Sequence, residues 1–306
     1  MKYYGLQIFL FLCLTIFSLR VYSANQKEHF DRDSIALILK QVYARDQAPR
    51  LIIDSLMKKG ITDGNLFLPT VMQQRSGDSI NLKEVLPIVD AISKYAIYDL
   101  EAKAYETCWL VIQHADNNIK VKYTSFVEQL AKRKLIPLSS YMAFIDRLNI
   151  DKYKAQIYGY QFKRFANGAL MQYPVLKGWK RKWKDLGLKC KKNILPSEYV
   201  INYPIVYINR NQYALIGFIY KGKSDWGIEK LMPIKDAAIL VSGKVVTTAN
   251  ANGYFFVILN KKMLPKTINI RIDGHLFKYS IQNMETRDFS ILGGYYSDGK
   301  LDIIDM

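Results

Sequence analysis

The sequence predicts a two-domain protein, with an all-α helical N-terminal domain followed by an all-β C-terminal domain of the β-sandwich type. Apolar residues recur at three- and four-residue spacing through the N-terminal half, which is typical of helices that pack on one face. From about residue 200 onward, short runs of β-branched and aromatic residues are separated by turn residues, which is typical of a sandwich. At 306 residues, half of them hydrophobic, the chain is long enough for two cores and is not a disordered protein.

Helices are expected in the N-terminal half wherever the apolar spacing is sustained. The first begins near Asp33-Ser34, bends or restarts at Pro49, and ends at Lys58-Lys59-Gly60. Residues 61–80 are mixed in composition, which favours a loop. Four further helices are expected over residues 82–96, 101–115, 123–134 and 139–148, and Ser139-Ser140 can cap the last of these.

Strands are expected in the C-terminal half around three turn signals. Residues 213–221 form the first long strand, and the dipeptides Ser242-Gly243 and Asp273-Gly274 each separate two short strands. Asn252-Gly253 is the strongest hairpin signal, because both residues tolerate the left-handed backbone of a tight turn. The strand after it is expected over residues 254–259.

Residues 1–23 have the pattern of a cleavable secretory signal. Lys2 supplies the positive charge, and Leu6 to Leu19 supply the apolar core. That core is about 14 residues long, shorter than the roughly 20 that a membrane span needs. Small side chains at Val21 and Ser23 place the cleavage after Ser23. We therefore expect a secreted or periplasmic protein with no transmembrane span after cleavage, and the alternative is an uncleaved anchor.

Positive charge is concentrated between the two expected domains, in a chain whose formal net charge is +17. We expect an α-helical domain over residues 24–165, a basic linker over 166–199, and the sandwich over 200–306. The stretch Lys177–Lys192 interleaves basic residues with Trp179 and Trp183, a pattern that suits anionic components of a cell envelope. The alternative is a solvated basic face whose tryptophans pack on a neighbouring domain. Nucleic acid is not an expected partner of an exported protein.

Two cysteines remain after removal of the signal. Cys108 lies in an apolar helical run, where a free thiol behaves as a small apolar group, and Cys190 lies in a lysine-rich stretch. The compartment permits a disulfide, but two cysteines cannot form a framework of bridges. Whether Cys108 and Cys190 pair is left open.

His114 is the candidate for acid–base chemistry, since histidine titrates near neutral pH and acts as a general base when a carboxylate orients it. Asp116 is two residues away and points elsewhere on a continuing helix, so it is better placed to cap the next one. Asp146 or Asp46 is the expected orienting carboxylate. The alternative is a semi-buried histidine bonded to backbone.

Further polar residues recur beside the same apolar stretches, where burial costs free energy unless they bind one another or a ligand. Arg50 and Arg147 suit an anion, although Asp46 and Arg50 also have the spacing of an intrahelical ion pair. The candidate ligand-binding residues are Asp46, Gln47, Arg50, Gln113, Asp116, Arg147, Gln156, Tyr158 and Gln161, and the candidate catalytic residues are His114 and Asp146.

No metal and no cofactor are expected from the sequence. The three histidines, His29, His114 and His275, lack the paired helical spacing of common zinc sites. A site built on His114, Asp116 and Asp146 is the alternative. The chain has no phosphate-cradling glycine loop and no nucleophile elbow.

Four polar motifs follow one another over residues 32–165, and together they resemble a bacterial domain family of unknown function. The family usually has threonine at the position of the bulkier Tyr160, so the resemblance does not imply a ligand of identical shape. Because the family has no assigned activity, the resemblance implies a domain and no particular reaction. The motifs are Asp46-Gln47 with Arg50, Trp109 with Gln113-His114-Ala115-Asp116, Asp146-Arg147, and the run from Gln156 to Phe162.

Residues 214–281 resemble a carboxypeptidase-regulatory-like, transthyretin-like sandwich. Such modules usually support or bind and do not catalyse. The resemblance is carried by Gly217-Phe218-Ile219, residues 233–241, residues 246–255 and residues 270–274.

Three functions follow from these observations. The first is an exported binding module whose helical domain holds a small polar or anionic ligand, with the sandwich as a support or interaction module. The second is a hydrolase with His114 as general acid or base. The third is a structural cell-envelope protein with no ligand. Whether the protein is an enzyme is left open.

Overall fold

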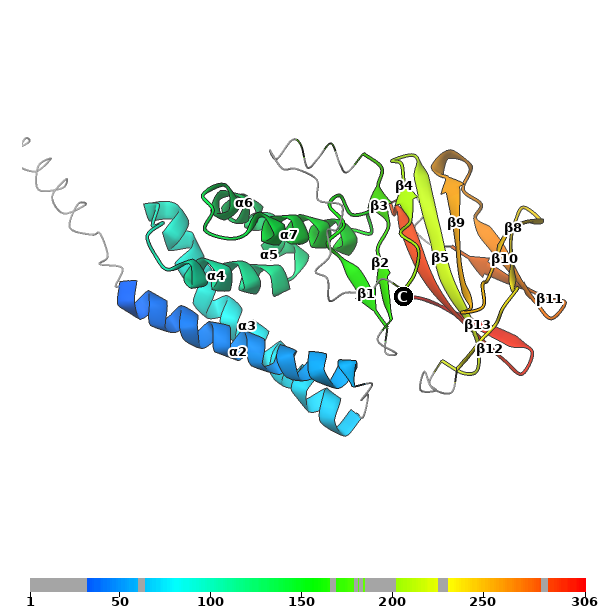
Figure 1. Ribbon diagram of the computed structural model, residues 1–306, viewed down its shortest axis with the longest axis horizontal. Helices are drawn as coiled ribbons and strands as arrows, with labels where there is room; N and C mark the ends of the chain where they lie inside the picture. Colours follow the sequence, from blue (N-terminus) through cyan, green and yellow to red (C-terminus); the bar gives the residue numbers. More distant parts are fainter. Residues whose placement is uncertain are drawn as a thin grey trace, which may run out of the picture.

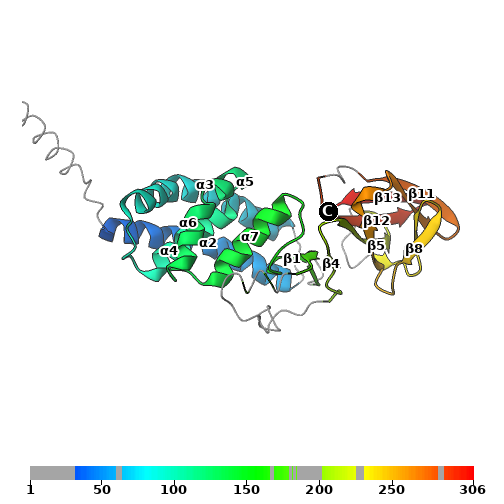
Figure 2. The same cartoon turned by 90° about the horizontal axis from the view of Figure 1, so that it is seen from above.

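A computed structural model describes residues 32–59, 64–165, 169–178, 181, 184, 202–224, 231–281 and 286–306. Helices fill the first part of the chain and strands the second, which confirms the predicted fold class. The two regions lie end to end (Figures 1 and 2). The expected signal sequence, His29, the helix stop at Gly60, Trp179, Trp183, Cys190 and most of the expected linker lie outside the described residues.

The helical region packs around one apolar core. Leu39, Val89, Ile112 and Leu130 lie fully inside it, together with the free thiol of Cys108, whose pKa is raised by burial to about 12. Burial of this thiol in an apolar environment makes it inert. The helices are α2 (Arg32–Lys58), α3 (Gly64–Tyr95), α4 (Ala102–His114), α5 (Asn117–Lys122), α6 (Thr124–Lys132) and α7 (Leu138–Asp151).

The second helix is longer than predicted, whereas the first spans nearly the residues expected for it. The expectation of a loop over residues 61–80 is wrong, because α3 begins at Gly64 and continues through Pro69 and Pro87. Helix α2 likewise continues through Pro49. The physical reason is tertiary packing: α2 and α3 lie against each other, and Arg45 donates to the buried Asn81 at 2.6 Å, so partners compensate for weak local propensity.

The helix starts also differ from the prediction at two places. The short helix α5 was missed, and Asp116 caps it by accepting from Ile119 N at 3.2 Å, as an aspartate after the end of α4 was expected to do. The capping of the last helix by Ser139-Ser140 is wrong. Helix α7 has Pro137 as its N-cap residue, so both serines lie within its first turn.

The β region is sandwich-like, with two sheets around a shared core. One sheet has the order β13-β12-β5-β6, with β9 also paired to β5, and the other has the order β11-β10-β7-β8. Ile239 and Ile270 of the second sheet pack with Leu215 and Phe255 of the first. The bounds are β5 (Gln212–Lys221), β6 (Met232–Pro233), β7 (Ala238–Val241), β8 (Lys244–Thr248), β9 (Tyr254–Asn260), β10 (Thr267–Ile272), β11 (His275–Ser280), β12 (Phe289–Ser297) and β13 (Lys300–Asp305), with a 3₁₀ turn at Lys261–Met263.

Two of the three turn signals make hairpins. Ser242-Gly243 joins β7 to β8, Asp273-Gly274 joins β10 to β11, and all four residues have positive φ. The hairpin expected at Asn252-Gly253 is wrong: β8 pairs with β7, whereas β9 pairs with β5. This turn carries the chain from one sheet to the other, and the glycine is required there because a Cβ would lie 2.3 Å from Ile219 O.

Residues 152–165 and 169–176 lie between the two regions and pack on the outer face of the sheet that contains β5. Ala155 and Met171 lie in one core with Ile216 and Phe289. The strands of this segment are β1 (Phe162–Arg164), β2 (Leu170–Gln172) and β3 (Val175–Leu176), and β3 pairs in parallel with β4 (Tyr207–Ile208). In the described ranges, no helix combines the length and the apolar character of a membrane span.

Candidate functional site

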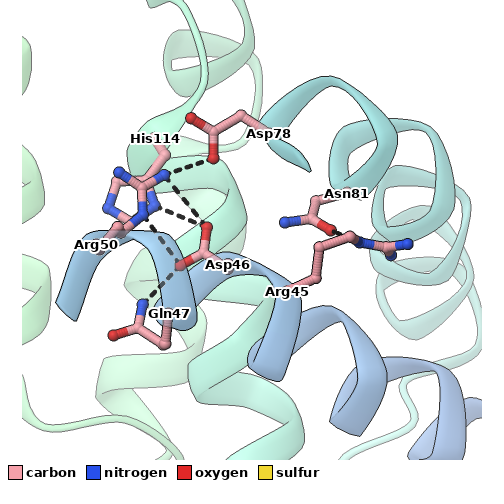
Figure 3. Close-up of polar contacts among 7 residues, drawn as sticks. All are labelled: Arg45, Asp46, Gln47, Arg50, Asp78, Asn81 and His114. Carbon is pink, nitrogen blue, oxygen red and sulfur yellow. Dashed lines mark hydrogen bonds and ion pairs between the residues drawn. The ribbon is translucent and has the colours of Figure 1, made fainter. Parts of the chain in front are cut away.

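Five polar side chains from three helices meet at one place in the helical region (Figure 3). Asp46, Gln47 and Arg50 come from α2, Asp78 from α3, and His114 from the last turn of α4. We refer to these five residues as the Asp46 cluster. The spacing of Asp46 and Arg50 places both on one face of α2, so the helix itself orients them toward α3 and α4.

Asp46 is the centre of the cluster, with only 1% of its side chain exposed. Its Oδ1 lies 3.1 Å from His114 Nδ1 and 3.3 Å from Arg50 Nη2, and its Oδ2 accepts from Gln47 Nε2 at 2.6 Å. Burial acts to raise the pKa of Asp46, but His114, Arg50 and Gln47 together lower it below its ordinary value of 3.8. The carboxylate is therefore ionised at neutral pH and accepts hydrogen bonds only.

His114 is neutral at pH 7, with Nδ1 protonated. Burial lowers its pKa below the ordinary value of 6.5, the charges of Arg50 and Arg147 lower it further, and Asp46 acts in the opposite direction. Because Asp46 can only accept, the proton of the neutral ring lies on Nδ1 and Nε2 is an acceptor. No other described residue hydrogen-bonds the ring, whose side chain is 16% exposed.

Arg50 joins the two carboxylates of the cluster. Its Nη2 lies 2.5 Å from Asp78 Oδ1 and 3.3 Å from Asp46 Oδ1. One ligand atom from each of Asp46, Asp78 and His114 lies within 4.8 Å of the other two, a donor set that divalent metals accept. The guanidinium contacts both carboxylates in this arrangement, so it supplies the positive charge that a cation would bring.

Arg147, on α7, is a second cation whose charge reaches His114, and it forms no ion pair with a carboxylate in the described part of the chain. Its charge acts on His114, and its own pKa is lowered by burial and by the charge of Arg50. Asp151 raises it, but that carboxylate is paired with Lys120. Within the described part of the chain Arg147 makes no ion pair, and its buried Nε has no hydrogen-bond partner. A cation in this position favours an anion.

Asp146, expected to be catalytic, holds a loop. Its Oδ1 accepts from the backbone N–H groups of Ile157 and Tyr158 at 2.7 and 2.9 Å, and its Oδ2 accepts from Tyr160 N at 2.8 Å. Burial raises the pKa of Asp146 to about 6, although these N–H groups act to lower it. Of the two carboxylates that were candidates to orient His114, Asp46 is the one in contact with it.

The glutamines of the same loop bind backbone as well. Gln156 donates to the carbonyls of Gln161 and Tyr173 at 3.1 and 2.8 Å, and Gln161 Nε2 donates to Ala143 O at 2.8 Å. Tyr158 is buried and packs with Met142. These three candidates therefore order the loop after α7, which was the alternative explanation for their presence.

Gln113 stays among the candidates. It is 5% exposed, and its Oε1 has no hydrogen-bond partner among the described residues. Trp109 Nε1, one turn earlier on α4, is also buried and has no hydrogen-bond partner in the ranges that the structure describes. An unmet acceptor and an unmet donor on one helix face are costly unless water or a ligand satisfies them.

Asp78 is the member of the cluster that sequence analysis missed. It lies in the stretch that was expected to be a loop, so its side chain was given no partner. The available signal was its spacing from Asn81 and Glu84, which places three polar residues on adjoining faces of a helix.

Comparisons of the chain with protein-family models, with curated proteins and with solved structures gave no match.

Proposed function

We propose that the helical region binds a small anionic ligand beside His114, with Arg147 as its principal contact. The observation that carries this proposal is the state of Arg147: its buried Nε has no hydrogen-bond partner, its charge acts on the neutral His114, and it forms no ion pair with any described carboxylate. Arg50 is neutralised by Asp46 and Asp78, so Arg147 is the cation that an anion would pair with.

The chemistry of the two groups narrows the class of ligand. A guanidinium binds a carboxylate or phosphate through two parallel N–H donors. His114 Nε2 accepts, so the ligand must offer a proton there. Hydrogen phosphate and hydroxy acids meet both requirements, whereas sulfate at neutral pH has no proton to donate.

The test is a thermal-shift titration of the purified protein with inorganic phosphate and with sulfate at pH 7. We expect phosphate to raise Tm, because a ligand that binds only the folded state stabilises it, and sulfate to raise it less. Arg147→Met should abolish the phosphate shift. Arg133→Met is the matched control, since Arg133 lies over the Tyr98 ring away from the Asp46 cluster.

The proposal fails if neither phosphate nor a hydroxy acid such as tartrate raises Tm of the wild type. It also fails if Arg147→Met keeps the full shift. Lack of any stabilising anion would favour the structural envelope role, in which the polar residues only connect the helices.

A hydrolase is the second candidate, favoured by the contact between Asp46 and His114. A carboxylate on Nδ1 fixes the ring so that Nε2 can take a proton from water, as a general base requires. We expect any hydrolytic activity found in a substrate screen to be abolished in His114→Gln and strongly reduced in Asp46→Asn. Activity that survives His114→Gln would exclude this candidate.

Export is part of the proposal and rests on the residues before Ala24. A positive Lys2, an apolar core from Leu6 to Leu19 and small side chains before the expected cleavage point support it. Mass spectrometry of the protein recovered outside the cytoplasm should give a chain that begins at Ala24. Recovery of the intact precursor in the membrane fraction would instead support an anchor.

The β region is proposed as a support or interaction module. Its two-sheet architecture is compatible with the carboxypeptidase-regulatory-like resemblance of residues 214–281, and the helical region is compatible with the domain family of unknown function. The basic stretch Lys177–Lys192 is the proposed contact with anionic envelope components. A pull-down with cell-wall material at low and at high salt tests that contact, which should weaken as salt rises.

A further inference from the structure

A groove of about 800 Å³ lies on the helical region and shares no residue with the Asp46 cluster. It is formed where the start of α4, the end of α6 and the start of α7 come together. Its lining is mainly apolar and includes Ala131, Leu135, Leu138 and Tyr141. A volume of this size falls within the range of small-molecule sites.

The charge at the groove is positive. Glu128 and Lys132 both line it, and they neutralise each other through a contact of 2.7 Å. Lys134 lines it as well, is exposed, and makes no ion pair among the residues that the structure describes. One unpaired ammonium group therefore stands beside an apolar surface.

Lys134 also has a backbone conformation that favours glycine. Its φ is 61°, and it terminates α6 with hydrogen bonds from its own N to Ala131 O at 3.0 Å and from Leu135 N to Leu130 O at 2.9 Å. Helices commonly end in this way with glycine in the left-handed position, since other residues are strained there. A lysine in that position is a reason to look for a use of its side chain.

We propose that this groove binds a free single-chain aliphatic carboxylate. The alkyl chain would lie along Leu135, Leu138 and Tyr141, and the carboxylate would pair with Lys134. An apolar lining that includes one unpaired cation is complementary to a molecule that is apolar along its length and anionic at one end. This inference is independent of the ligand proposed for His114.

The test is isothermal titration calorimetry of the full chain with decanoate below its critical micelle concentration. 1-Decanol and decyltrimethylammonium are titrated in the same way for comparison. We expect decanoate to bind with a Kd below about 1 mM, decanol more weakly, and the cation not at all. Lys134→Gly should weaken decanoate binding about three- to fivefold, as expected for loss of one partly exposed ion pair, while raising Tm because the strain is relieved. Leu138→Ser should weaken it about tenfold.

Lys152→Ala is the matched control, because Lys152 is an exposed lysine at the end of α7 that does not line the groove. It should bind decanoate as the wild type does. The proposal is overturned if the wild type gives no saturable binding, if decanol binds as tightly as decanoate, or if Lys134→Gly keeps the wild-type affinity. Circular dichroism of each variant confirms the fold, and Tyr141→Phe serves as a milder change of the lining if Leu138→Ser unfolds.

Discussion

At the scale of single residues, His114 is balanced between one carboxylate and two cations. Asp46 contacts its Nδ1 and stabilises the imidazolium, whereas burial and the charges of Arg50 and Arg147 favour the neutral ring. The neutral form prevails because desolvation is the largest of these effects. His114 is therefore an acceptor at neutral pH, which the anion-binding proposal requires.

The balance can be tested by following the His114 ring by NMR as a function of pH. We expect the pKa of His114 to lie below 6.5 in the wild type. Arg147→Met should raise this pKa, because it removes a positive charge that repels the imidazolium. Asp46→Asn should lower it further, because it removes the negative charge that stabilises the imidazolium. Because the unfolded histidine binds its proton first, wild-type stability should fall relative to His114→Gln as pH drops below 6.5. A pKa above 6.5 would contradict this account.

Asp146 provides a second prediction, on stability. Asp146→Ala leaves three backbone N–H groups, one buried and two partly buried, without their acceptor, so we expect a loss of about 3 kcal/mol in the free energy of unfolding. Asp146→Asn keeps one acceptor oxygen and should lose about half as much. Urea denaturation measures both, and a loss below about 1 kcal/mol for the alanine variant would contradict the structural role.

Part of this site was predictable from the sequence. Residue type and helical spacing identified Asp46, Arg50 and His114, because an i, i+4 pair on a helix fixes which side chains share a face. The choice between Asp46 and Asp146 was not predictable, since both are carboxylates beside apolar stretches and only tertiary packing decides which one reaches the ring. Asp78 was missed because residues 61–80 were expected to form a loop. Helical spacing therefore could not be used to predict which side chains share a face with Asp78.

At the scale of elements, the space around each glycine decides whether a side chain can be added there. Gly217 in β5 lies under the ring of Phe255, and a Cβ there would be 2.3 Å from Phe255 Cζ. Gly77 in α3 faces α2, but a Cβ there would meet Arg45 Cγ only at 3.5 Å, an ordinary contact. One glycine is required by packing and the other is not.

Alanine at these two positions should therefore change stability in opposite directions. Gly217→Ala forces the Phe255 ring out of its position, and we expect a loss of about 2 kcal/mol. Gly77→Ala relieves the entropic cost of glycine within a helix and should gain about 0.5–1 kcal/mol. Thermal unfolding monitored by circular dichroism measures both, and a loss at Gly77 would show that α2 and α3 are packed more closely than described.

The elements that the sequence predicted best are those specified by local chemistry. Ser242-Gly243 and Asp273-Gly274 form hairpin turns because their residues tolerate positive φ, and α4 follows a sustained apolar period. The turn at Asn252-Gly253 was placed correctly but its role was not. The same type of turn can form a hairpin between two neighbouring strands, or it can lead the chain from one sheet to the other. Which of the two occurs depends on pairing with strands that are distant in the sequence.

At the scale of the whole molecule, the segment after α7 packs on the β region through a core of its own, and Ile150 of α7 packs against that core. Ala155 and Met171 pack with Ile216 and Phe289 on the outer face of the β5 sheet. Asp288, just before β12, hydrogen-bonds the segment after α7, and we refer to this contact region as the junction. Its backbone N donates to Tyr153 O at 2.8 Å, and its Oδ2 accepts from Ala155 N at 3.1 Å. Such a junction should make the two regions unfold together.

Asp288→Ala tests this coupling. The substitution leaves Ala155 N and the partly buried ammonium of Lys261 without their acceptor, so we expect the junction to lose about 1–3 kcal/mol. Hydrogen-exchange mass spectrometry measures the free energy of opening of each peptide. Peptides of α4 and β5 should have similar free energies of opening in the wild type, whereas in the variant these two free energies should differ. Asp302→Ala, at an exposed position of β13 outside the junction, is the control and should leave them equal. If Asp288→Ala also leaves them equal, apolar packing alone couples the two regions, and the ligand proposed at His114 would then be expected to protect β5 as well as α4.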